Sequence, residues 1–463
     1  MRTVLAVAAF AFLPGAAPAQ PPAPPVPVAP PQPAPLPPGH APPLGAEQPF
    51  LQPGTEVSQP LTPVGAAPAP RLPDIPVPPP PDVAKSAEPT EPKHLLPPVP
   101  AVRASGPLGP SWNSFELLCW WPLRQPVPPL VYGTRTGQPP ALNDPATRVL
   151  IGGRAFGTEP HAGGRFTLGS ALNCDETFGY EVTYLFLGTR TFADRTTDAG
   201  PGPVRAFGLP YTNATTGAAE FLALSTPGAN NSLLTASTSG RVQGWEVNGV
   251  ASVLDEKQLR LNALVGWRYL QVNEGLRLEQ SQFRYADLPG VVRTADQFDA
   301  HNRFHGGQIG LHGDARRGPV FCEMTAKVAF GQNYEVVKNE GMTVIQAPVF
   351  GGTATRAFGG SGIYVQPSNA GRTAGGAFAV VPEGTIKLGF RLGDSGRVYL
   401  GYSFIYLSDA VRPGDQVDHT LSPGQVPLVN GLGPALNADR PARVVNRTDF
   451  WTQGLVIGLE ARY

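Results

Sequence analysis

Carboxylate, imidazole and hydroxyl side chains that could act together lie around the segment HNRFH, where Asp299, His301 and His305 are close in sequence. With Ser403 they supply the groups of a nucleophilic triad, and two histidines with a carboxylate could also bind a metal. A spacing of four residues places side chains on one face of a helix, but on a strand they stand about 13 Å apart. The chain also lacks a GxSxG motif. We therefore predict that the protein is not an enzyme and that these histidines lie at a membrane interface.

Signatures of other bound groups are incomplete. The glycine-rich segment 351–362, GGTATRAFGGSG, lacks the Lys-Ser/Thr ending and the following helix of a nucleotide site. Lys plus Arg and Asp plus Glu number 35 each, so no basic field indicates nucleic acid. Three widely separated cysteines allow at most one disulfide, and none is expected. We expect no metal, no cofactor and no nucleic-acid partner.

A second set of charged residues recurs at alternate positions of ten apolar segments. If these segments are strands of a barrel, the charged side chains face the lumen. There they could line a narrow channel for small solutes, with a slight basic excess favouring anions, or form a salt-bridge network that fills and stabilises the lumen. The residues are Glu116, Glu181, Glu246, Arg260, Arg268, Glu323, Lys327, Lys387, Arg391, Arg397, Glu460 and Arg462, with Arg165 and Glu383 beside them.

The segments themselves alternate apolar and polar residues, as strands do when one face meets hydrocarbon. They cover 114–121, 165–169, 178–188, 241–253, 259–270, 304–313, 320–332, 378–392, 397–407 and 449–463. Short and long connections alternate strictly between them, which is typical of outer-membrane barrels with periplasmic turns and long external loops. We predict an all-β, antiparallel transmembrane barrel of ten strands. Twelve strands is the alternative, because 334–346 could form a further hairpin.

The last segment, DFWTQGLVIGLEARY, is the clearest of the ten. Its apolar face ends the chain on an aromatic residue, and we interpret Leu455, Ile457, Leu459 and Tyr463 as the C-terminal signal that barrel assembly machinery reads. Charged residues make up only 15% of the chain, against about 25% in typical soluble proteins. Outer-membrane lipid is therefore a predicted partner, together with the assembly machinery.

The N-terminal part has a different composition. A charged start, an apolar run at 4–13 and the small residues of Ala17-Pro18-Ala19 predict a signal peptide over 1–19. Residues 20–110 hold more than half of the 56 prolines, which favours an extended arm without a core. This disordered periplasmic arm could be a spacer or a tether to the cell wall. The barrel is expected over 111–463, in the outer membrane.

Four segments resemble the putative β-barrel porin-7 family of bacterial outer-membrane proteins. They are FELLCWWPLRQPVPPLVYGT, GWEVNGV, LNALVGWRYLQVNEGL and TDFWTQGLVIGLEARY, and the resemblance covers about residues 111–463. It implies an outer-membrane barrel with a porin-like role and transfers no functional residues. Three functions stay open: a channel, a structural or tethering barrel with a plugged lumen, and a surface binding protein. The last rests on the long predicted loops at 189–239, 333–376 and 408–447.

Overall fold

The computed structural model describes the chain from residue 109 onward, with short gaps. The described ranges are 109–123, 125–135, 138–141, 144–156, 159–197, 206–284, 289–430 and 439–463. The predicted signal peptide at 1–19 lies outside them, as do residues 20–108 of the predicted arm. Within the described ranges, no helix is long and apolar enough to cross a membrane.

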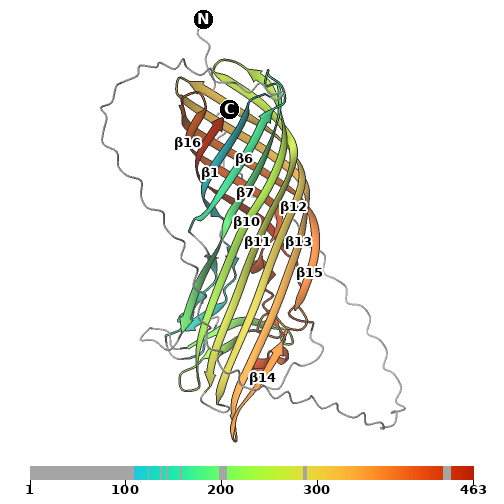
Figure 1. The fold of residues 1–463 in the computed structure, drawn as a ribbon. Coiled ribbons are helices and arrows are strands. Elements are labelled where there is room, and N and C mark those ends of the chain that lie inside the picture. Colours follow the sequence, from blue (N-terminus) through green and yellow to red (C-terminus); the bar gives the residue numbers. More distant parts are fainter. Residues whose placement is uncertain are drawn as a thin grey trace, which may run out of the picture. The chain divides into compact units, whose positions relative to one another are not determined.

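Ten long strands form a closed antiparallel barrel (Figure 1). They are β1 (Ser111–Pro122), β6 (His161–Ala171), β7 (Phe178–Thr197), β10 (Asn230–Asp255), β11 (Leu259–Arg284), β12 (Gly290–Arg317), β13 (Val320–Val349), β15 (Gly371–Leu392), β16 (Gly396–Val411) and β18 (Arg447–Arg462). The sheet has eleven strands, of which β14 (Gly352–Gly359) is a branch on β13; pairing of β12 with β13 closes the other ten into a ring. The predicted all-β barrel of ten strands is confirmed.

Short turns join the strands at one end of the barrel. They lie between β6 and β7, β10 and β11, β12 and β13, and β15 and β16. In two of these turns Gly318 and Gly393 have φ values of 61° and 68°, a backbone conformation that residues with a Cβ rarely adopt. Outer-membrane barrels place their short turns in the periplasm. This is therefore the periplasmic end, and β1 begins there beside the end of β18.

The strands extend further from the periplasmic end than the sequence predicted. Two ranges expected to be loops, 189–239 and 333–376, are mostly strand. Residues 334–346 continue β13 without a break and stay paired with β12, so the twelve-strand alternative is wrong. Away from the periplasm the outward side chains of β12 become polar, as at His301 and Arg303. The outward apolar face that identifies a lipid-facing strand is lost there, which hid these extensions.

The outer wall of the periplasmic half is an apolar band. Val265, Ile309 and Ile457 expose 65%, 56% and 55% of their surface there. Rings border this band on its extracellular side: Trp245, Tyr269, His305 and Tyr334 follow one another across β10 to β13, with ring centroids 6.2, 4.9 and 5.8 Å apart. Such an aromatic girdle marks a membrane–water interface.

The remaining elements fold into an extracellular cap. β3 (Val131–Thr134), β4 (Arg148–Ile151), β8 (Ala206–Asn213), β9 (Ala219–Ser225) and β17 (Thr420–Leu421) form a second sheet, and β2 (Gln125–Val127) pairs with β5 (Arg154–Phe156). Short helices η1 (Pro413–Gln416), η2 (Pro423–Gln425) and α1 (Pro427–Asn430) complete it. The cap and inward side chains of the strands bury one core, in which Phe207, Phe298 and Tyr364 are almost fully enclosed. The described parts of the long connections are therefore packed structure.

One place in the barrel wall has few backbone hydrogen bonds. β15 pairs with β13 from Gly371 onward, but its ladder with β16 begins only at the pair Glu383 and Ile405. Beyond that pair, the N–H of Val380 donates to the Ser408 hydroxyl at 2.9 Å. We call this part of the β15–β16 boundary the seam.

Candidate functional site in the barrel lumen

Charged side chains converge inside the periplasmic half of the barrel, because the outward face of each strand there is apolar. Glu246 and Glu383 lie at the centre of this charged layer. Lys327 binds Glu246 at 2.5 Å and Glu383 at 3.5 Å. Arg268 binds Glu246 at 2.9 Å and also contacts Glu383, which Arg165 approaches to 3.5 Å. Three cations thus surround two carboxylates, and the five side chains come from five strands.

A second group in the charged layer is built around Glu116 of β1. Arg165 lies 3.2 Å from its carboxylate and Lys387 lies 3.0 Å away. The Tyr399 hydroxyl donates to the same carboxylate at 2.9 Å. Lys387 also binds Glu323 at 2.8 Å. Because Arg165 and Lys387 each contact two carboxylates, the groups join into one network.

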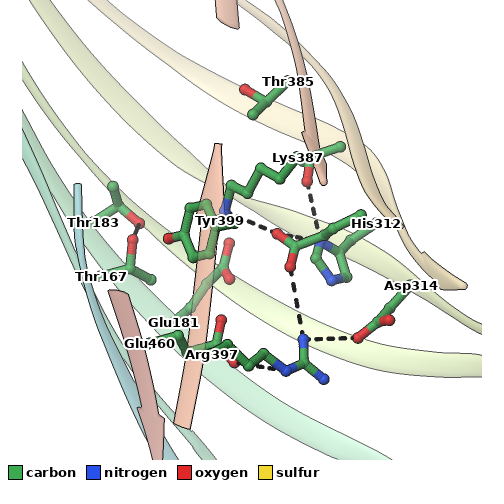
Figure 2. A network of polar contacts seen from close by, with 12 residues as sticks. Thr167, Glu181, Thr183, His312, Asp314, Thr385, Lys387, Arg397, Tyr399 and Glu460 are labelled. Carbon is green, nitrogen blue, oxygen red and sulfur yellow. Dashed lines mark hydrogen bonds and ion pairs between the residues drawn. The ribbon is translucent and has the colours of Figure 1, made fainter. Parts of the chain in front are cut away.

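Toward the periplasm the network continues through Arg397. Figure 2 shows Lys387 of β15, His312 and Asp314 of β12, and Arg397 of β16 directed toward the same part of the lumen. Arg397 binds Asp314 at 2.9 Å and approaches Glu460 at 3.7 Å. Ion pairing therefore extends from the middle of the lumen to its periplasmic end.

The predicted lumen residues do not all enter this network. Glu181 accepts a hydrogen bond from Asn248 at 2.9 Å. Arg260 lies nearer the turns, 3.2 Å from Asp255, and Arg462 pairs with Glu460 at 2.7 Å. Arg391 is different. It alternates in phase with the inward residues of β15, but its side chain is exposed at the periplasmic rim. Among the described residues Arg391 has no ion-pair partner, so the structure does not place it in the lumen.

A cavity lies within and below the charged layer. Its volume is about 150 Å³ and its lining runs from Pro110 and Trp112 at the periplasmic end up to Glu246 and Glu383. A cavity of this size and polarity is large enough for several waters. Water can therefore reach the charged layer from the periplasmic side.

Above the charged layer, the lumen is filled by apolar side chains that the sequence analysis missed. The members of this apolar layer point inward and include Trp120, Phe304 and Phe450, with Leu118, Leu187, Val272 and Val456 beside them. The Arg165 guanidinium of the charged layer lies 5.3 Å from the centre of the Trp120 ring. Phe321 lies nearer the periplasm, at the start of β13, where its ring centre is 4.8 Å from the Arg397 guanidinium. The signal was present in the sequence, since Leu118 and Trp120 share the face of Glu116.

A third layer closes the lumen on the extracellular side. Arg412, which follows β16, turns inward and binds Glu274 of β11 at 2.9 Å, with both side chains almost fully buried. The Asn302 side chain donates to the Val411 carbonyl and accepts from its N–H, both at 2.8 Å. These contacts hold the chain after β16 across the opening, below the cap.

The putative beta barrel porin-7 family matches residues 112–463 of this chain. The chain belongs to this family. No curated protein matches it. Among solved structures, the chain is similar to the outer-membrane protease OmpT of Escherichia coli, with 8% identity over 76% of this chain and 97% of the protease, and a TM-score of 0.36. A FadL homologue of Pseudomonas aeruginosa has 9% identity over 77% of this chain and 90% of its own, with a TM-score of 0.19.

Membership of the porin-7 family makes this chain a bacterial outer-membrane β-barrel protein. The predicted chemical residues are dispersed on that barrel. His305 belongs to the aromatic girdle, and His301 hydrogen bonds with Asn273 at 3.0 Å on the same outer wall. Ser403 is buried on the inner wall, 2.9 Å from the Thr385 hydroxyl. Asp299, His301 and His305 are thus separated from Ser403 by the wall, so the described geometry assembles no triad.

In the porin-7 barrel, the glycine-rich segment 351–362 is followed by turns and β15 and not by a helix. It forms β14 and the turns beside it, at the tip of the hairpin with β13. In the described ranges, no group of three metal-ligating side chains is close enough to hold a metal ion.

Proposed function

We propose that this outer-membrane protein is a structural barrel with a closed lumen, and not an open channel for small solutes. The observation that carries the proposal is the apolar layer, in which Trp120, Phe304 and Phe450 each expose 2% of their surface or less. An ion or polar solute would have to cross this layer without water. Barrels of about eight strands are generally filled by side chains, whereas water-filled porins have about 16 to 18 strands.

The charged layer supports the same function. Its cations and carboxylates are paired with one another, so few fixed charges are free to attract a permeating ion. Separating buried ion pairs is costly, because each partner then lacks its counter-charge in a medium of low dielectric. A paired network therefore stabilises the barrel wall from within.

The other parts of the function follow from this structural role. We propose that a signal peptide exports the chain, that assembly machinery recognises the strand ending at Tyr463, and that the proline-rich arm tethers the barrel to the cell wall. We assign the barrel no catalytic role, since Asp299, His301 and His305 lie on the opposite side of the wall from Ser403.

Conduction in planar bilayers tests the closed lumen. We expect wild-type protein to give silent bilayers. Trp120→Ala combined with Phe304→Ala shortens two side chains of the apolar layer and should produce a measurable conductance. Arg391→Gln, outside the charged layer, is the control and should stay silent. Steady conductance of the wild type would instead support the channel, which the periplasmic cavity favours as the second candidate.

A further inference from the structure

The outer wall on the extracellular side of the aromatic girdle is basic. On β10 to β13 and β15, six cationic side chains and three carboxylates occupy outward positions, an excess of three positive charges. The cations are Arg241, Arg277, Arg293, Arg303, Lys338 and Arg372, and the carboxylates are Glu279, Asp299 and Glu340. We call this surface the basic belt.

The carboxylates of the belt neutralise only part of it. Glu279 pairs with Arg277 at 2.7 Å and Glu340 with Lys338 at 2.6 Å. Arg303 and Arg372 are exposed and have no carboxylate partner among the described residues. Arg372 also stands directly opposite Lys338 in the β13–β15 ladder. Like charges in directly opposed positions repel, so an external anion would stabilise this pair.

The girdle sets the depth of Arg303 in the membrane. Arg303 is two residues from His305 on the same face of β12, and it is paired across the ladder with Tyr334. Both rings belong to the aromatic girdle. Side chains at this level meet the headgroups of the outer leaflet. Arginine is suited to them, because its guanidinium binds phosphate oxygens through two parallel hydrogen bonds.

A hydrogen-bonded row of amides adjoins the belt. Gln243 donates to Gln271 at 2.8 Å, and Gln271 donates to Asn273 at 3.2 Å. The row continues to His301, whose ring nitrogen lies 3.0 Å from Asn273. These polar groups are fixed in place on strands, which suits a hydrated headgroup and not an acyl chain.

We propose that the basic belt binds phosphate-bearing headgroups of lipids in the outer leaflet, with Arg303 and Arg372 as the principal contacts. The inference is independent of whether the lumen conducts. It assigns the outer wall a lipid partner of defined chemistry.

Lipid retention tests this proposal. Protein would be placed in nanodiscs containing equal amounts of phosphatidylglycerol and phosphatidylcholine, and the retained phosphatidylglycerol measured by native mass spectrometry. A basic residue near an anionic surface is worth about a fivefold change in affinity. The double variant Arg303→Gln/Arg372→Gln should therefore retain markedly less phosphatidylglycerol than the wild type. Arg148→Gln/Arg356→Gln, two exposed arginines in the extracellular cap and in the β13–β14 hairpin, should retain as much as the wild type.

Two further arms complete the experiment. Arg303→Lys/Arg372→Lys keeps the charge and should recover most of the retention, which separates lipid binding from a folding defect. Inorganic phosphate added to the wild type should displace little lipid. Equal retention by both glutamine variants, or complete displacement by inorganic phosphate, would overturn the proposal.

Discussion

The two halves of the barrel are inverted relative to each other. In the periplasmic half, β12 turns Ile309 outward and buries Gln308; in the extracellular half, it buries Phe298 and turns Asp299 outward. The reason is a change of solvent along one strand. Lipid surrounds the first half, so apolar side chains cover the outside, whereas water surrounds the second half and drives them into the core. The same alternation therefore places apolar side chains outside the barrel in the periplasmic half and inside it in the extracellular half.

The largest expected effect concerns the interior of the periplasmic half. Arg268→Gln removes a cation from Glu246 and Glu383, which leaves buried carboxylates short of a partner. We expect a loss of about 3–5 kcal/mol in the free energy of unfolding. Thermal unfolding in detergent measures it, and Arg391→Gln should leave the melting temperature unchanged. A stable Arg268→Gln variant would show that the charged layer contributes little.

The outer surfaces of the two halves should respond differently to an added charge. Ile457→Arg places a cation in the lipid-facing band and should cost about 2–4 kcal/mol and impair membrane assembly. Ala295→Arg places the same cation outward in the extracellular half of β12 and should assemble normally. Heat-modifiable migration on gels, which reports a closed barrel, measures both. Equal tolerance at the two positions would contradict the inversion.

A smaller effect is expected where the cap meets the extracellular half. Asp296 is buried inside β12 and accepts hydrogen bonds from the N–H groups of Ile363, Tyr364 and Val365, at 3.0 to 3.1 Å. Asp296→Ala leaves these N–H groups without acceptors, at a cost of about 1–3 kcal/mol. Limited proteolysis at 360–370 should then be faster, while the membrane half keeps its heat resistance.

The same carboxyl should make the cap sensitive to pH. Burial raises the pKa of Asp296 to about 6, against the three N–H donors that lower it. In the unfolded chain its pKa is near 3.8. The folded state thus holds the proton more tightly, so this contribution to stability is complete below about pH 4 and is lost as the pH rises through about 6. Proteolysis at 360–370 should accelerate from pH 5 to pH 7 in the wild type, and much less in Asp296→Ala.

The sequence predicted the membrane half of this comparison better than the extracellular half. Ten strands, their phase and the positions of the short turns were all predicted, because lipid imposes an outward apolar face. The apolar layer was not predicted. Segments such as ELLCWW are apolar on both faces, so the alternation does not show that Leu118 and Trp120 form an inward apolar layer. Partners across the lumen could not be predicted either: Arg268 and Glu383 are 115 residues apart, and only closure of the barrel sets their relative height.

The predictions of extracellular structure were wrong for a related reason. The outer wall of β12 and β13 faces water in the extracellular half, so the outward residues there are polar. The sequence from Gly290 to Phe304 therefore lacks the apolar alternation of a membrane strand and resembles a loop. The apolar partners of these extracellular strand segments lie in the cap, and they come from elements far apart in the chain. Nothing local to β12 indicates that Phe298 will meet Tyr364 and Phe207 in one core.

The seam between β15 and β16 has a mechanical consequence. Where continuous ladders hold a strand on both sides, strain from heat or from bending of the bilayer is shared with the neighbouring strands. At the seam, Val380 and Ser408 replace a run of backbone ladder with a side-chain contact. Strain should therefore concentrate there, and local opening should begin at the extracellular end of β15 and travel toward the periplasm. The barrel wall is closed, and we expect it to open first along the seam.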